Sequence, residues 1–118
     1  MDSDRYTETD NNEPTVDIER TAEIADILRN ARRIQVILEL DVAGEDGLAV
    51  GELADRIAER EHGPHFSPEA RKAVYVALYQ SHVPTLEVWD GDGVIDCERD
   101  VVTRGRRFEE VRSALSRL

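Results

Sequence analysis

Lysine, cysteine and aromatic residues are scarce in this sequence. The one cysteine, Cys97, excludes an internal disulfide and suits a reducing cytoplasm. Two Phe, three Tyr and one Trp leave a core that must be aliphatic. No apolar run approaches the roughly 18 residues of a membrane-spanning helix. The first residues are acidic and lack the basic start and apolar centre of a signal peptide. We therefore expect a cytoplasmic protein with one modest core.

Negative charge dominates the composition. Acidic residues outnumber basic ones by 26 to 15, which gives a net charge of −11. Lys72 is the only lysine, so every other basic residue is arginine. An acidic, lysine-poor chain is typical of proteins from a molar-salt cytoplasm, because net charge maintains solubility while salt screens the self-repulsion. The composition therefore indicates a halophilic protein.

The chain divides into three segments of different character. Residues 1–16 are polar and acidic and show no hydrophobic periodicity, so we expect a disordered tail. Residues 17–105 carry helical and strand patterns and form the predicted domain. Residues 106–118 are predicted to form a C-terminal helix.

Two helices are predicted in the first part of the domain. Apolar residues recur with helical spacing from Asp17 to a break at Asn30, and again over residues 31–40. One face of the first helix carries Ile18, Ala22, Ala25 and Leu28, and another carries Ile24 and Ile27. The inward positions predicted for the second helix are Ile34, Ile37, Leu38 and Leu40.

Two more helices follow a short apolar run at residues 48–50 that predicts a small strand. The third helix covers about residues 52–61, with Gly51 as a weak N-cap. Its expected inward positions are Val50, Leu53, Ala54, Ile57 and Ala58. Ser67 and Pro68 are typical of a helix start, and this fourth helix should reach about His82. Its expected buried stripe is Ala70, Val74, Ala77, Leu78 and Ser81.

Residues 94–97 and 101–103 are two β-prone runs, and their linker, residues 98–100, predicts a β-hairpin. The order helix, helix, strand, helix, helix, hairpin, helix is the layout of a winged helix-turn-helix. In that layout the fourth helix reads DNA and the hairpin is the wing. The sequence thus predicts a mainly α fold with a small β-hairpin, an α+β winged helix-turn-helix.

Several motifs resemble a family of haloarchaeal winged-helix domains of unknown function. They are the pair Arg32-Arg33, the E-L-A…I-A helix from Glu52, the pattern R-K-x-V-Y-x-x-L-Y-x-x-H-x-P-x-L over residues 71–86, and G-V-I from Gly93. The resemblance covers about residues 18–105. It implies a cytoplasmic, regulator-like protein without known catalysis or cofactor. Val50-Gly51 departs from the family's Ser or Thr before the E-L-A helix, and residues 86–93 depart from its usual helix end.

The candidate DNA-contact residues lie on the fourth helix and around the wing. On the helix they are Arg71, Lys72, Tyr75, Tyr79 and Gln80, and around the wing they are Arg99, Arg104, Arg106 and Arg107. Arg71 and Lys72 lie near the helix N-terminus, which usually enters the major groove. Alternatively, the tyrosines pack against neighbouring helices and the arginines pair with local acids. Acidity weakens the counterion-release contribution to DNA binding, but at molar salt short-range contacts decide.

No motif points to an enzyme. The nucleophile elbow, the P-loop, the zinc-protease helix motif and the dinucleotide fingerprint do not occur. His62, His65 and Cys97 fall short of a four-ligand zinc site, and residues 90–101 fail the EF-hand pattern. We therefore expect no catalytic residue, no metal, no cofactor and no small-molecule ligand.

A final stripe at the C-terminus has 3-4-3 spacing and consists of Phe108, Val111, Leu115 and Leu118. It can pack onto the protein's own first helices, or it can pair two chains into a homodimer that presents two recognition helices to a palindromic site.

The favoured interpretation of the whole chain is a DNA-binding transcriptional regulator. The alternative is a protein–protein interaction module that keeps the winged-helix fold without binding DNA.

Overall fold

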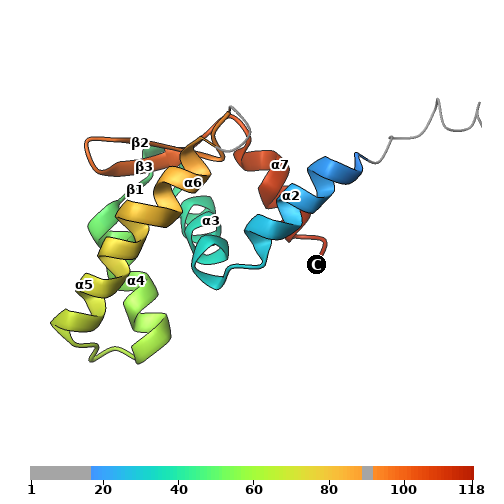
Figure 1. Cartoon of the computed structure of the whole chain (residues 1–118). Helices are drawn as coiled ribbons and strands as arrows, with labels where there is room; N and C mark the ends of the chain where they lie inside the picture. The colour runs from blue at the N-terminus through green and yellow to red at the C-terminus, as the bar shows by residue number, and fades with distance from the viewer. Residues whose placement is uncertain (1–16, 89–91) are drawn as a thin grey trace, which may run out of the picture.

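The computed structural model describes residues 17–88 and 92–118, so the tail predicted at residues 1–16 lies outside the described residues. In chain order the elements are α2 (Ile18–Leu28), α3 (Ala31–Ala43), the 3₁₀ turn η1 (Gly44–Asp46), β1 (Leu48–Ala49), α4 (Val50–His62), α5 (Pro68–Ala77), the π-helical turn η2 (Leu78–His82), α6 (Val83–Glu87), β2 (Ile95–Glu98), β3 (Val101–Arg104) and α7 (Phe108–Leu115). The fold is mainly helical with one small antiparallel sheet, as the α+β prediction requires (Figure 1). None of the described helices is long and apolar enough to cross a membrane.

The sheet has three strands in the order β1-β3-β2. Leu48 of β1 lies opposite Val102 of β3, and Ile95 of β2 lies opposite Arg104. Leu48, Ile95 and Val102 are buried, whereas Asp96 and Glu98 point away from the core and are exposed. The predicted hairpin and the predicted short strand are both confirmed, and the first strand of the domain joins the last one in a single sheet.

The hairpin turn is tighter than the sequence predicted. Glu98 pairs with Val101, so only Arg99 and Asp100 form the loop. Both have positive φ, 54° and 65°, as in the mirror-image turns whose twist matches that of the flanking strands. The Asp100 carbonyl accepts a hydrogen bond from the Val50 N–H at 2.9 Å. The turn is thereby attached to the start of α4.

Helix α4 buries the apolar stripe that its periodicity predicted, namely Val50, Leu53, Ala54, Ile57 and Ala58. Gly51 is not the N-cap. Because β1 runs directly into α4, the extended residue Ala49 occupies that position and Gly51 lies inside the helix.

In α3 the prediction for Leu38 was also wrong, since its side chain is 42% exposed. Val36 and Leu40 face the core, and at 100° per residue Leu38 falls on the opposite side of α3.

Helix α5 begins as predicted, with Ser67 Oγ accepting the Ala70 N–H at 3.0 Å and Pro68 in the first turn. The helix then widens in η2, where the Val83 N–H bonds to the Leu78 carbonyl five residues earlier. Pro84 follows this turn and has no N–H to give. The wide turn holds an extra residue, so His82 and Val83 are buried while Ser81 is exposed, contrary to prediction.

Helices α2 and α7 lie side by side on the side of α3 away from α5 (Figure 1). Of the two faces predicted for α2, the one carrying Ile24 and Ile27 packs inward. Of the other face only Leu28 is buried, because α3 and α7 contact α2 from one side alone. Its remaining members, Ile18, Ala22 and Ala25, are exposed. Helix α7 is shorter than the predicted 106–118 segment.

Candidate nucleic-acid interface

The solvent face of α5 and η2 carries part of the predicted DNA-contact set. Lys72 and Gln80 are exposed, and the Tyr79 side chain is 53% exposed. Val74 and Leu78 are fully buried on the opposite side of the same helix. The apolar stripe that docks α5 onto the core therefore fixes which polar residues point outward.

Arg71 is turned toward the protein instead. Its Nε donates to Asp55 Oδ1 at 2.5 Å and its Nη2 to the Gly51 carbonyl at 3.2 Å, which ties α5 to α4. The guanidinium also lies 5.9 Å from the Tyr75 ring centroid. Tyr75 is half-buried and stacks on Tyr79 with ring centroids 6.0 Å apart. Arg71 and Tyr75 thus form packing contacts, and Tyr79 is the tyrosine that reaches solvent.

The four arginines predicted as DNA contacts around the hairpin divide into two outward and two inward side chains. Arg99 is exposed in the hairpin turn, and Arg106 is 83% exposed with Asp92 at 3.8 Å. Arg104 donates to the Asp41 carbonyl at 2.9 Å at the end of α3, and its guanidinium lies 5.0 Å from the ring centroid of Phe108.

Arg107 is the second inward arginine. Its side chain is 5% exposed, and its Nε donates to Glu110 at 3.3 Å. A buried guanidinium does not reach a nucleic acid in this conformation, so Arg107 has a structural position rather than the predicted surface position. The sequence shows that Arg107 is charged, but whether its side chain is buried or exposed depends on how α7 packs.

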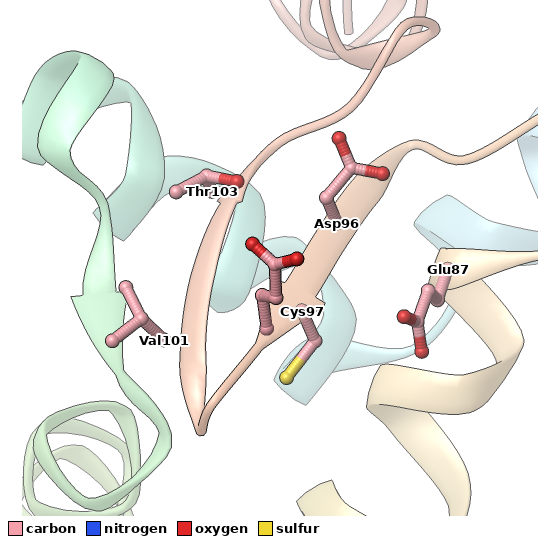
Figure 2. Close-up of a pocket in the computed structure, with 6 residues that line it drawn as sticks. Glu87, Asp96, Cys97, Val101 and Thr103 are labelled. Carbon is pink, nitrogen blue, oxygen red and sulfur yellow. The ribbon is translucent and has the colours of Figure 1, made fainter.

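A hollow of about 430 Å³ lies between α6 and the outer face of the hairpin. It is lined by Glu87, Asp96, Cys97, Glu98, Val101 and Thr103 (Figure 2). We call this hollow the acidic groove. Sequence reasoning missed it because its acids come from two elements, α6 and β2, that only the fold brings together. Burial, followed by the nearby charge of Glu87, raises the pKa of the Cys97 thiol, which keeps the sulfur protonated.

A second hollow of about 330 Å³ joins the hairpin turn to η2 and is lined in part by Tyr79, Arg99 and Asp100. The negative charge of Asp100 raises the pKa of the Tyr79 hydroxyl. The solvent-exposed Tyr79 of η2 and the hairpin turn therefore lie next to each other.

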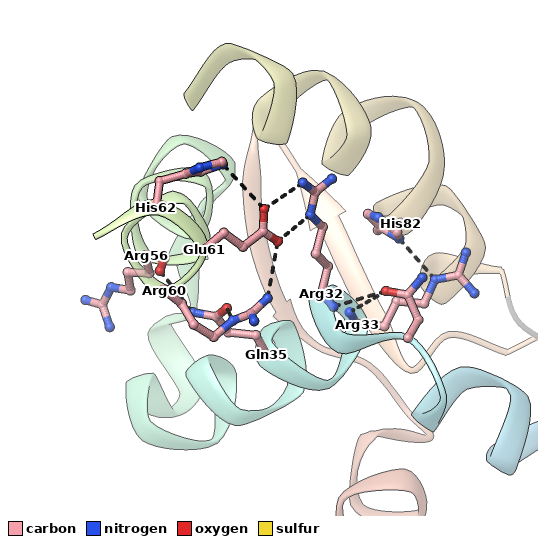
Figure 3. A network of polar contacts seen from close by, with 9 residues as sticks. Arg32, Arg33, Gln35, Arg56, Arg60, Glu61, His62 and His82 are labelled. Atoms are coloured by element: carbon pink, nitrogen blue, oxygen red, sulfur yellow. Dashed lines mark hydrogen bonds and ion pairs between the residues drawn. The ribbon is translucent and has the colours of Figure 1, made fainter. Parts of the chain in front are cut away.

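The arginine pair of α3 connects three helical segments. Arg32 makes two hydrogen bonds to Glu61 of α4, at 2.7 and 2.8 Å, and these bonds lower the pKa of Glu61 (Figure 3). Arg33 Nε donates to Nδ1 of the buried His82 in η2 at 3.1 Å. His82 is thus a buried histidine that accepts a hydrogen bond from α3. The pair thus fixes α3 against α4 and against the π turn.

Stability should decrease as the pH falls because of His82. Burial, followed by the charges of Arg33 and Arg32, lowers the pKa of His82 below its ordinary value of 6.5. The unfolded chain then binds a proton at a higher pH than the folded chain, so the free energy of unfolding decreases as pH drops from about 7 to about 5. His82→Gln, whose amide oxygen can accept from Arg33, should reduce this slope in chemical denaturation. His65→Gln, at an exposed histidine, is the control; an unchanged slope in the His82 variant would contradict the assignment.

Within residues 17–88 and 92–118, no three His, Cys, Asp or Glu side chains gather as a metal-ligand set. Residues 90 and 91 of the stretch that fails the EF-hand pattern lie outside the described residues. The polar side chains that do converge are the pairs Arg32–Glu61 and Arg33–His82 and the acids that line the acidic groove.

No curated protein and no solved structure is significantly similar to the chain. Residues 25–103 match a protein family, and this match extends from α2 to β3 and covers more than half of the sequence. It includes the α3 arginine pair, α4, α5, the π turn and most of the hairpin. The chain therefore belongs to the family described as Domain of unknown function (DUF7344).

Proposed function

We propose that the protein is a DNA-binding transcriptional regulator of the winged helix-turn-helix type, adapted to the salt-rich cytoplasm of a halophilic archaeon. The observation that carries this proposal is the order β1–α4–α5–η2–α6–β2–β3, in which η2 and α6 continue α5 without a break, together with the sheet order β1-β3-β2. In such a layout two consecutive helices precede a β-hairpin, and the second helix enters the major groove. Here that helix is α5, with its continuation η2.

Three exposed side chains support the choice of this face. Lys72 lies in α5, Gln80 in η2 and Arg99 in the hairpin turn. A cation and an amide on the helix suit phosphate and base-edge contacts, and Arg99 suits the phosphate backbone or the minor groove. In molar salt the few local contacts of such a face determine affinity, since the Debye length is then only about 3 Å.

Lys72→Ala should weaken DNA binding about ten-fold while leaving the domain folded. The measurement is enrichment of sheared genomic DNA in molar KCl, followed by fluorescence titration of an enriched site. Arg117→Ala, an exposed cation at the far end of the chain, is the charge-matched control and should bind as the wild type does. Arg71 is unsuitable for this test because its loss also removes the α4–α5 contacts. Equal binding by the Lys72 variant would remove α5 from the proposed interface.

The acidic groove favours a second candidate function, a protein-interaction module. Glu87, Asp96 and Glu98 line a hollow close to Tyr79 and Arg99, and their carboxylates repel phosphate. A basic protein segment is the partner whose charge complements this surface. Folded protein that enriches no DNA, together with loss of a captured basic partner in Glu98→Gln, would favour this candidate over the regulator.

A further inference from the structure

The outer face of α2 carries apolar side chains that no described part of the chain covers. Ile18 is 77% exposed, and Ala22 and Ala25 are exposed as well. Their spacing of four and three residues places them on one face of α2, which ends at the buried Leu28 and lies opposite the buried Ile27. An amphipathic helix ordinarily has one apolar face, so the second one on α2 requires an explanation.

Helix α2 is also held firmly to the rest of the protein. Arg20 donates from Nε and Nη2 to the two carboxylate oxygens of Glu110 in α7, at 2.5 and 2.8 Å. The hydrogen bond from Arg20 is the main reason that the pKa of Glu110 is lowered to about 2. The carboxylate therefore stays charged at neutral pH, and the pair keeps α2 against α7. The exposed face is thus presented on a fixed helix.

A shallow hollow of about 500 Å³ follows this face. It is lined by Ala22, Glu23, Ala25, Asp26 and Arg29. The two alanines form its low floor, and Ile18 protrudes one turn away on the same face. The surface therefore carries both a projecting apolar side chain and a recess, which makes it complementary to a copy of itself.

We propose that two copies of this chain pair through this face of α2, with the two helices antiparallel about a two-fold axis. Charge determines the direction. Asp17 and Glu19 lie at the N-terminal end of α2, and Arg29 lies at its C-terminal end. Antiparallel pairing brings Arg29 of one copy beside the acidic end of the other, whereas parallel pairing would bring like charges together. Arg29 already contacts Asp26 of its own helix, but both side chains are largely exposed and that contact is weak.

The size of this surface sets the expected affinity. An 11-residue helix is about 16 Å long, so the pair buries less than the roughly 1,200 Å² of a standard stable interface. The dimer should therefore be weak and depend on concentration. The C-terminal stripe on α7 is less suited to pairing two chains than α2 is. Two of its members, Phe108 and Val111, lie in the core of the single chain at 1% and 0% exposure. DNA takes no part in the pairing, so its test is independent of the proposed function.

Sedimentation velocity of the full chain in molar KCl tests the surface. The wild type should form dimers as its concentration rises, and Ala22→Glu should weaken the association at least about ten-fold, because it buries a charge without a partner. Val42→Glu is the matched control, since Val42 is an apolar residue on α3 with 82% exposure. A wild type that stays monomeric at high concentration overturns the proposal, and so does an Ala22 variant that associates like the wild type.

Cross-linking tests the direction. In a Cys97→Ser background, the variants Ile18→Cys and Arg29→Cys are mixed and gently oxidised. The two positions are about 16 Å apart along one helix, and a disulfide requires Cα atoms within about 7 Å. Antiparallel pairing predicts covalent dimers that contain one chain of each variant. Dimers that contain only the Ile18 variant would show parallel pairing and overturn the proposed arrangement.

Discussion

Replacement of Gly47 by alanine is expected to lower the free energy of unfolding by about 4 kcal/mol or more, or to prevent folding. Gly47 has a φ of 73° and immediately precedes β1. A Cβ atom there would lie 2.1 Å from the Val102 carbonyl oxygen and 2.8 Å from Cγ2 of Thr103. The Val102 oxygen belongs to the backbone of β3, so relief of the clash would require β1 to move away from β3.

Gly44 provides the control for this experiment. Its φ is 79°, but a Cβ atom there has no heavy atom within 4 Å. Gly44→Ala should therefore cost only the 1–2 kcal/mol, roughly, of a left-handed backbone in a non-glycine residue. Denaturant titration of both variants separates the steric contribution from the conformational one. Similar losses in the two variants would show that β1 and β3 are not in contact as described.

Local physics explains the elements that the sequence predicted well. The stripe of α4 follows from the spacing of its apolar residues, and the start of α5 follows from Ser67 and Pro68. The hairpin follows from two β-prone runs separated by polar residues. Each of these signals lies within a few residues of the structure that it specifies.

The features that the sequence did not predict depend on contacts between distant residues. The π turn places His82 under Arg33, which is 49 residues earlier in the chain. Likewise, periodicity offered two apolar faces for α2, and only the positions of α3 and α7 decide which one is buried. A single sequence also does not show which acid or carbonyl group an arginine contacts.

The candidate site illustrates the same division. The exposed positions of Lys72 and Gln80 follow from the helical period once Val74 and Leu78 are taken as buried. Arg104 and Arg107 could not be placed in this way, because they lie in and after a short strand whose neighbours come from α3 and α7. Helical periodicity therefore predicted the exposure of the candidate residues on α5 and η2 better than the strand pattern predicted it for the arginines around the hairpin.

Phe108→Ala is expected to destabilise the protein by about 3–5 kcal/mol, the usual cost of removing a buried phenyl ring. Phe108 is 1% exposed and is among the largest fully buried side chains. Its ring also lies beneath the Arg104 guanidinium, so its loss would remove packing from the α3 end that Arg104 contacts. The measurement is chemical denaturation at a low and at a high protein concentration.

Leu118→Ala separates the two interpretations of the C-terminal stripe. Leu118 is 87% exposed, so its truncation should change the free energy of unfolding by less than about 0.5 kcal/mol. If the stripe instead paired two chains along its whole length, the Leu118 variant would lose stability that returned as the protein concentration was raised. A large loss at Phe108 that does not vary with concentration, with none at Leu118, would assign α7 to the core of each chain and leave α2 as the surface available for pairing.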